Sequence, residues 1–293
     1  MDYRKAYGLP ERYFLSLGRM VEKKNLSTLL AAYGRYCDEW RVTCDESARQ
    51  APASLVFVGS GELEGALREQ ASALGLRVID RSDWKVNGRE EAQEGGGGET
   101  VFRKDGVSVG ESSETRDSLP ATSHEENCGT VFFYGFRQIE ENPVFYALAE
   151  AFILPSLKEE WGLVVNEAMA CSLPVIVSRT AGCAEDLLPG SESWQCSVGS
   201  IQFGEEKTTD DRKPLTDDSL EERSNGFVFD PSSVDALSDA LRRIAEGETA
   251  DGGDAAATLK AEMGRRSREI VAKFSCENFA RQAMRATEAA GAS

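Results

Sequence analysis

The chain has 293 residues, 50 of them acidic and 33 basic, which gives a formal net charge of −17. A hydrophobic content of 41% suits a globular protein, and the acidic balance excludes collagen, a pure linker and a basic nucleic-acid binder. Because no stretch approaches the roughly 18 apolar residues of a membrane span and the N-terminus lacks the apolar run of a signal peptide, we expect a cytoplasmic, soluble protein.

Short apolar runs alternate with longer amphipathic stretches along most of the chain. The runs predict about six strands, at residues 13–18, 55–59, 130–135, 151–155, 174–178 and 226–230. Between them, apolar residues recur at helical spacing, as in the series Leu26, Leu29, Leu30 and Tyr33. The alternation predicts an α/β fold with a Rossmann-like, doubly wound parallel sheet. Ligands bind such sheets at the carboxyl ends of the strands, so the loops there are the candidate sites.

The first of these loops carries two cations. The strand ends at Gly18, Arg19 follows directly, and Lys24 comes just before a helical stretch. Cations beside a helix N-terminus suit an anion, because the unpaired amides and the helix dipole add to the side-chain charges. Two solvated surface cations are the alternative.

The second strand ends in a glycine loop, from Gly59 to Gly61, and Asp80 lies 21 residues after Gly59. This spacing is similar to that of a dinucleotide-binding fingerprint, which would make the chain an NAD-dependent oxidoreductase. The next glycine is Gly65, however, so the pattern is G-x-G-x-x-x-G and not the required G-x-G-x-x-G. We therefore interpret the loop as a tight strand-to-helix turn near the ligand.

Two polar segments carry most of the net charge. Residues 80–128 hold twelve acidic and six basic residues (net −6), and residues 190–224 hold nine and four (net −5). Neither can bury enough apolar surface to fold alone, so both are predicted to be disordered or loop insertions, with a docking or regulatory role as the alternative. The prediction is one domain over 1–293, whose core comprises about 10–79, 129–189 and 225–290.

The segment from Phe152 to Ser178 combines the most features. Glu159 falls in the loop after the fourth strand, Gly162 stands at the expected helix start, and Glu167 lies inside the helix. Both carboxylates can face one pocket, and a glycine at a helix start lets a ligand approach exposed amides. The alternative is that the two acids are only capping or solvated helix residues.

Histidine and cysteine chemistry is not expected. The single histidine, His124, lies in the first polar segment, so a histidine zinc site or a Ser-His-Asp triad lacks its usual parts. Seven cysteines form no C-x-x-C pair and are expected to be reduced thiols. The chemistry should therefore use carboxylates, cations and backbone amides.

The acidic pair resembles the E-x7-E signature of the retaining glycosyltransferases of family 4, with WGLVVNEAMA between and after the two acids. Further blocks support the resemblance in the right order: SLGRMVEKKN (16–25), LVFVGSGEL (55–63), VFFYGFRQ (131–138) and NGFVFDPSSVDAL (225–237). Together they cover the chain from about residue 10 to its end, apart from the two insertions. The resemblance implies the C-terminal, nucleotide-sugar-binding domain of a GT-B enzyme that transfers a hexosyl unit with retention from a donor such as a UDP- or GDP-sugar.

The resemblance also implies roles for individual residues. Arg19 and Lys24 would hold the donor diphosphate, Glu159 would bind hydroxyls of the transferred sugar, and Glu167 would bind the ribose. Cations suit the charge that develops on the departing diphosphate, and carboxylates suit hydroxyl donors. The other implied donor contacts are Gly18, Gly59 and Gly61 in the glycine turns, Trp161, Gly162, Leu163 and Val164 against sugar and diphosphate, and Phe136 and Arg137 against the base.

No metal or other cofactor is expected. The family is generally argued to react by front-face attack, with leaving oxygen and acceptor hydroxyl on the same side of the sugar. The sequence has no D-x-D motif, and the aspartate pairs at 210–211 and 217–218 are read as solvated charge of the second insertion.

The chain departs from the pattern in two places. It opens where the family has its interdomain linker, so the acceptor domain is expected to be absent, through truncation, separate encoding or true loss. The acceptor, whether glycan, lipid or small molecule, is then not identified, and a non-catalytic nucleotide-sugar-binding or interaction module is the alternative function. Ser172 stands where the family commonly has glycine, and it should be strained if that glycine serves a positive φ.

Overall fold

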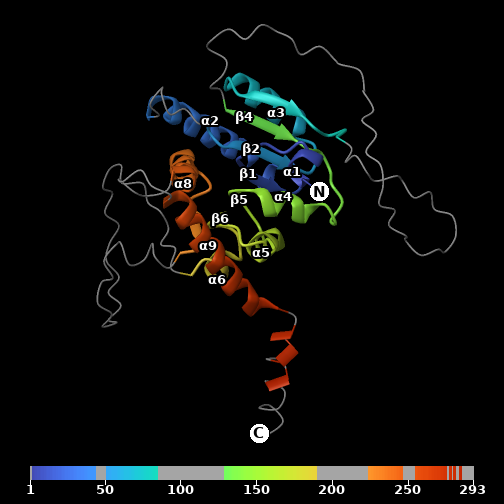
Figure 1. Cartoon of the computed structure of the whole chain (residues 1–293), viewed down its shortest axis with the longest axis vertical. Helices are drawn as coiled ribbons and strands as arrows, with labels where there is room; N and C mark the ends of the chain where they lie inside the picture. Colours follow the sequence, from blue (N-terminus) through green and yellow to red (C-terminus); the bar gives the residue numbers. More distant parts are fainter. Residues whose placement is uncertain are drawn as a thin grey trace, which may run out of the picture.

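The structure is a computed structural model of the chain, coloured along the sequence in Figure 1. It describes residues 2–43, 51–84, 129–189, 224–246, 255–275, 277–278, 280–281 and 284–285. Most of both predicted insertions, at 85–128 and 190–223, lies outside the described residues, as do His124 and the two aspartate pairs. Residues 80–84 of the first predicted insertion are described and belong to the folded core: Asp80 ends a strand, and the indole Nε1 of Trp84 donates to the carbonyl of Ala6 at 2.9 Å.

A seven-stranded parallel sheet forms the centre of the molecule, which confirms the predicted α/β class. In sheet order the strands are β3 (Arg77–Asp80), β4 (Thr130–Phe133), β2 (Ser54–Val58), β1 (Tyr13–Leu17), β5 (Ala151–Leu154), β6 (Val175–Ser178) and β7 (Gly226–Phe229). The prediction of about six strands omitted β3. This edge strand has only two apolar residues, Val78 and Ile79, between exposed ends, so its sequence gives almost no strand signal.

The sheet is buried on both faces because successive strand residues point to opposite sides. Leu15 of β1 pairs with Val56 of β2 and Phe152 of β5, and all three contribute to one apolar cluster. The neighbouring residue Phe14 contributes to the cluster on the other face. Continuous apolar strands therefore supply both cores, as a doubly wound sheet requires.

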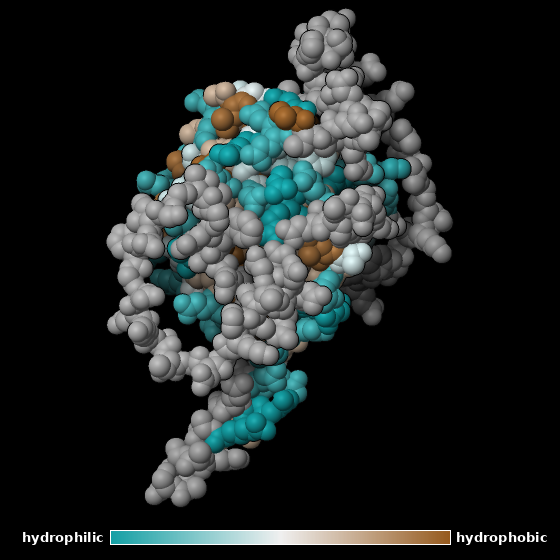
Figure 2. Space-filling model, turned by 90° about the vertical axis from the view of Figure 1, so that its left-hand side faces the viewer, coloured by the Kyte–Doolittle hydropathy of each residue, from teal (hydrophilic) through white to brown (hydrophobic). Residues whose placement is uncertain are grey.

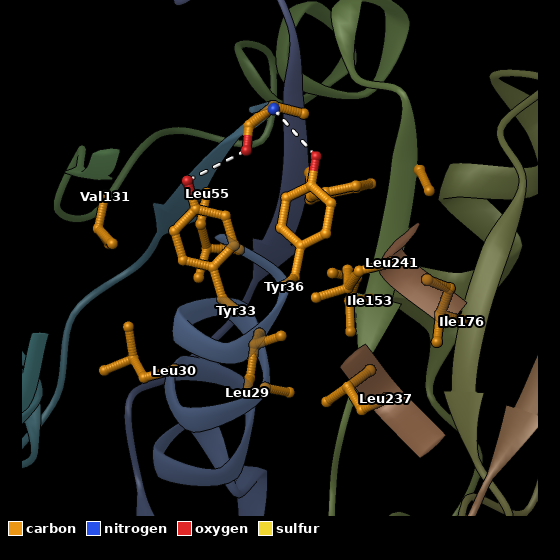
Figure 3. Packing of buried hydrophobic residues seen from close by; sticks show 14 of the residues in the cluster. Leu29, Leu30, Tyr33, Tyr36, Leu55, Val131, Ile153, Ile176, Leu237 and Leu241 are labelled. Carbon is orange, nitrogen blue, oxygen red and sulfur yellow. Dashed lines mark hydrogen bonds between the residues drawn. The ribbon is translucent and has the colours of Figure 1, made fainter. Parts of the chain in front are cut away.

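Three helices cover one face: α2 (Leu26–Thr43), α3 (Glu64–Ala73) and α8 (Val234–Glu246). Their apolar residues at helical spacing, such as Leu29, Tyr33 and Leu237, meet strand residues in the cluster of Figure 3. The hydroxyl groups of Tyr33 and Tyr36 bond the carbonyl and amide of Ala53 at 3.1 and 3.2 Å. These bonds satisfy polar backbone groups just before β2.

Shorter helices cover the other face: α1 (Tyr3–Ala6), α4 (Asn142–Leu148), α5 (Leu163–Ala170) and α6 (Ala184–Leu187). Helix α9 (Ala255–Val271) passes the β7 end of the sheet, where Met263 joins the first cluster and Ile270 the second, and a 3-10 turn, η2 (Ala272–Phe274), follows it. No helix among the described residues is long and apolar enough to cross a membrane. The described surface seen in Figure 2 is mainly hydrophilic, with separate small hydrophobic areas.

The strand order contains one reversal of direction. After β1 the chain builds β2, β3 and β4 on one side of it, and then crosses to build β5, β6 and β7 on the other. The carboxyl ends of β1 and β5 therefore border the crevice at which doubly wound sheets bind ligands. The loops after these two strands carry the predicted site residues Arg19, Lys24 and Glu159.

Candidate active site

The loops after β1 and β5 meet through an ion pair. Lys24 Nζ contacts the Oε2 atom of Glu159, and the two side chains are only 17% and 16% exposed. The backbone joins the same loops, since the amide of Leu157 donates to the carbonyl of Lys23 at 2.8 Å. Two residues that are 135 positions apart in the sequence are thus brought together at the reversal point of the sheet.

A short 3-10 turn, η1 (Glu22–Lys24), positions Lys24. It ends at Asn25, which adopts a left-handed conformation with φ of 55°, and α2 begins at the next residue. Asparagine tolerates this conformation better than most residues. Its side-chain amide donates to the carbonyl of Pro231 at 2.8 Å, which anchors the turn to the chain after β7.

Three contacts hold Glu159. Besides Lys24, the hydroxyl of Ser156 lies 3.3 Å from Oε2, and the amide of Gly182 donates to the Glu159 carbonyl at 3.0 Å. Ser156 is fully buried, and its carbonyl accepts hydrogen bonds from Ser178 and Thr180. Sequence reasoning missed Ser156, although a serine directly after a buried strand and a proline was an available signal.

Gly162 directly precedes α5, as predicted, with φ of 98° and ψ of 60°. A Cβ atom there would lie 2.9 Å from Leu154 Cδ2 and 3.4 Å from Glu159 Cγ. The positive φ and the close approach of Leu154 therefore favour glycine at this position, whatever a ligand needs. The adjacent thiol of Cys183 is buried, which raises its pKa to about 11 and keeps it neutral.

The second predicted carboxylate, Glu167, has a separate environment. It is half-buried in α5, and its Oε2 atom accepts a hydrogen bond of 2.9 Å from the hydroxyl of Tyr146 in α4. The described residues show no contact between Glu167 and the Lys24–Glu159 pair. The two acids therefore belong to different hydrogen-bond groups at the same edge of the sheet. Sequence reasoning missed Tyr146.

Arg19 and Lys24 line one pocket at the carboxyl end of β1. Arg19 is exposed and Lys24 half-buried, so both cations are near a solvent-accessible opening. The pocket is lined by Ser16, Leu17, Gly18, Arg19, Met20, Lys24, Leu26, Phe57, Val58, Leu154 and Pro155. This arrangement suits an anion, since two cations converge on a cavity at the reversal point.

The predicted glycines fit the loops against one another. A Cβ at Gly59, whose φ is 126°, would lie 2.1 Å from the carbonyl oxygen of Gly18. A Cβ at Gly61 would lie 2.4 Å from the carbonyl oxygen of Met20. The predicted tight strand-to-helix turn is therefore present, and these glycines are needed for backbone packing.

In the loop after β4, one predicted residue is exposed and the next is held by hydrogen bonds to the backbone. The side chain of Phe136 is 68% exposed, whereas Arg137 donates to the carbonyls of Arg81 and Trp84 at 2.6 and 2.8 Å. The Arg137 guanidinium thus braces the chain after β3. The two terminal nitrogens of Arg137 therefore bind backbone, and the predicted contact of this loop with a base stays a prediction.

The side chains of the residues around the start of α5 differ in their contacts and in their exposure to solvent. The indole Nε1 of Trp161 donates to Asn166 Oδ1 at 2.8 Å, and its ring centroid lies 6.0 Å from that of Phe274. Leu163 is 69% exposed and Val164 half-buried. Their predicted backbone contacts to a donor stay predictions.

The dinucleotide fingerprint is not formed in space. Asp80 pairs with Arg68 at 3.0 Å and stands at the end of β3, which β4 separates from the glycine-loop strand β2. The fingerprint needs its acid on the strand beside the glycine loop. The described residues also contain no group of three or more His, Cys, Asp or Glu side chains that could hold a metal ion.

Part of the chain is similar in sequence to a known protein family. Residues 107–202, about a third of the chain, match the family model described as "Glycosyl transferases group 1". O-antigen chain mannosyltransferase B of Escherichia coli is 37% identical over 57 residues, which is 20% of this chain and 15% of that protein. N-acetyl-alpha-D-glucosaminyl L-malate synthase of Bacillus anthracis is 42% identical over 53 residues, 18% of this chain and 14% of that protein.

Solved structures share the fold. Sucrose-phosphate synthase of Thermosynechococcus elongatus aligns with 99% of this chain and 49% of its own, at a TM-score of 0.52 and 20% identity. Anabaena HepE in complex with UDP aligns with 98% of this chain and 51% of its own, at a TM-score of 0.53 and 15% identity. The C-terminal domain of a group 1 glycosyl transferase from Francisella tularensis aligns with 93% of this chain and 92% of its own, at a TM-score of 0.50 and 13% identity.

The chain spans about half the length of the first two of these structures, and its matched segments amount to 15% and 14% of the curated relatives. At such identities the structural likeness shows the fold alone. The chain therefore has a segment that is similar to group 1 glycosyl transferases, on a fold that it shares with glycosyltransferases.

Proposed function

We propose that the chain is the donor-binding half of a retaining family 4 glycosyltransferase, which transfers a hexosyl unit from a nucleoside diphosphate sugar. The observation that carries this proposal is the meeting of Lys24 and Glu159 at the carboxyl ends of β1 and β5. The group 1 match and the shared fold support it. Neither the glycine loop nor Asp80 supports the rival oxidoreductase.

The proposed roles follow from charge. Arg19 and Lys24 bind the diphosphate, whose negative charge grows as it departs, so fixed cations stabilise the transition state more than the ground state. Glu159 accepts hydrogen bonds from hydroxyls of the transferred sugar. Glu159 neutralises Lys24 in the ion pair, so a diphosphate that binds Lys24 has to replace Glu159 as its partner.

The reaction itself exchanges one bond for another. The bond between the anomeric carbon and the diphosphate oxygen breaks, and its electron pair leaves with the diphosphate. The acceptor hydroxyl forms the new bond on the same face, and its proton passes to the departing oxygen. The proposal assigns the diphosphate charge to Arg19, Lys24 and nearby amides and includes no metal ion.

We further propose that a second domain or a separate chain supplies the acceptor site, for a glycan, lipid or small acceptor. The support for this is that larger proteins of the same fold, such as sucrose-phosphate synthase, extend to about twice the matched length.

The test is a thermal-shift titration with UDP-, GDP- and ADP-sugars and with NAD. A ligand at 100 times its dissociation constant stabilises the folded state by about 2.7 kcal/mol, which is readily measured. We expect one nucleotide sugar to stabilise the wild type and Lys24→Ala to lose the effect. Glu159→Gln should keep binding of the nucleoside diphosphate but lose the additional affinity for its sugar.

The matched control is Lys23→Ala, which removes the same charge from the neighbouring exposed side chain. It should bind like the wild type. Stabilisation by NAD alone, or equal effects of the two lysine substitutions, would contradict the proposal. Binding without any transfer or donor hydrolysis in the presence of an acceptor domain would favour the non-catalytic module.

A further inference from the structure

A tyrosine contacts the carboxylate of Glu167. Tyr146 lies in α4, is 2% exposed, and its hydroxyl donates to Glu167 Oε2 at 2.9 Å. Its ring packs edge-on against Phe152 of β5, with centroids 5.7 Å apart and planes at 61°. The hydroxyl therefore has a fixed position relative to the sheet.

The hydrogen bond has one possible direction. Burial and the adjacent Glu167 carboxylate raise the pKa of Tyr146, so the phenol stays protonated and remains the donor. A carboxylate accepts only, and it offers two oxygens. Within the described part of the chain, Tyr146 is the only side chain found to donate to this carboxylate, which leaves Oε1 available.

A glutamate on a helix is flexible unless it is held. Ordering a free glutamate side chain costs conformational entropy, which the binding of a ligand must otherwise offset. Because Tyr146 already holds one oxygen, the other is directed before any ligand arrives. The same bond joins α4, which follows the Phe136 loop, to α5, which follows the Glu159 loop.

We propose that Tyr146 is a positioning residue that holds Glu167 so that its free oxygen receives the vicinal hydroxyls of a nucleotide ribose. This inference rests on the proposed function, in which Glu167 contacts the ribose. It makes Tyr146 a determinant of the preference for ribonucleotides over nucleotides that lack the 2′- and 3′-hydroxyls.

The experiment compares two ligands on each protein variant. The ligands are the tightest binder among UDP, GDP and ADP and its 2′,3′-dideoxy analogue, and calorimetry gives the ratio of their affinities. We expect a ratio on the order of 10–100 for the wild type, the value of hydrogen bonds to a charged group. Glu167→Gln and Tyr146→Phe should both lower it, the latter by about 5-fold.

A double variant shows whether the two residues act together. If Tyr146 acts through Glu167, the ratio for Tyr146→Phe with Glu167→Gln equals that of Glu167→Gln alone. The matched control is Tyr13→Phe, which removes another buried tyrosine hydroxyl, bonded to the Phe145 carbonyl at 2.7 Å. This control should retain the wild-type ratio.

The outcomes separate the two proposals. A wild type that prefers the ribonucleotide, with a ratio unchanged in Tyr146→Phe, would overturn the positioning role alone. Equal weakening of both ligands in Tyr146→Phe would also overturn it, since that is the result of a purely structural contact. A wild type that binds no nucleoside diphosphate would overturn the proposed function together with this inference.

Discussion

Ser172 has a left-handed backbone conformation, which is unfavourable for a residue with a side chain. It follows α5, and its φ is 61°, one of two positive values among the non-glycine residues that the structure describes. Sequence comparison with the family predicted strain at this position, and the positive φ confirms the condition for it. The turn is also crowded, because a Cβ at Gly264 of α9 would lie 2.1 Å from the Ser172 carbonyl oxygen.

We expect Ser172→Gly to stabilise the protein. A left-handed residue with a side chain costs about 1–2 kcal/mol, whereas glycine adds about 0.5–1 kcal/mol of unfolded-chain entropy. The free energy of unfolding in urea should therefore rise by up to about 1.5 kcal/mol. Ser72→Gly, in an exposed position of α3, should instead lower it by about 0.5–1 kcal/mol. Equal effects of the two substitutions would contradict the strain.

At the scale of elements, the loops after β1 and β2 depend on each other. The amide of Gly18 donates to the Val58 carbonyl at 2.9 Å, and the amide of Met20 donates to the Ser60 carbonyl at 3.0 Å. Gly59 lies between these bonds with no space for a side chain. The conformation of the Arg19–Lys24 loop is thus set partly by the neighbouring loop.

Gly59→Ala should destabilise the protein by more than about 2 kcal/mol, because a methyl group would meet fixed backbone at a positive φ. It should also weaken nucleotide binding, since the β1 loop must move. Gly65→Ala in α3 is the control. No atom lies within 4 Å of its Cβ position, so helix propensity should raise stability by about 0.5–1 kcal/mol. Chemical denaturation measures both, and a neutral Gly59→Ala would refute the interlocking of the loops.

At the scale of the molecule, an ion-pair group closes the end of the sheet opposite the site. Arg12, just before β1, binds Glu150, just before β5, at 2.7 Å, and its guanidinium donates to the Ala245 carbonyl of α8 at 3.0 Å. Lys260 of α9 reaches Glu150 at 3.3 Å. Two strands and two helices that are distant in sequence are joined by these contacts.

Glu150→Gln should lower the free energy of unfolding by about 2–3 kcal/mol, because it leaves two largely buried cations without their carboxylate. Nucleotide affinity should stay unchanged, since the pair lies at the amino ends of the strands. Asp235→Asn breaks the half-exposed pair with Arg35 and should cost less than about 1 kcal/mol. Loss of nucleotide binding in a folded Glu150→Gln variant would contradict this separation.

Much of the architecture is present in local sequence patterns. Continuous apolar runs predicted six strands, helical spacing from Leu26 to Tyr33 predicted α2, and Gly162 was correctly placed at the start of α5. These features are encoded within windows of a few residues, because burial on one or both faces of an element requires apolar residues at a regular spacing. The weak edge strand β3 leaves almost none, since little of it is buried.

The sequence by itself thus determined the fold class, most elements and the candidate residues Arg19, Lys24 and Glu159. Only the tertiary structure decided that Lys24 pairs with Glu159, that Tyr146 holds Glu167 and that Arg137 braces backbone. The reason is physical: strand order and side-chain partners depend on contacts between segments up to 233 residues apart, and no local sequence pattern shows which segments will meet.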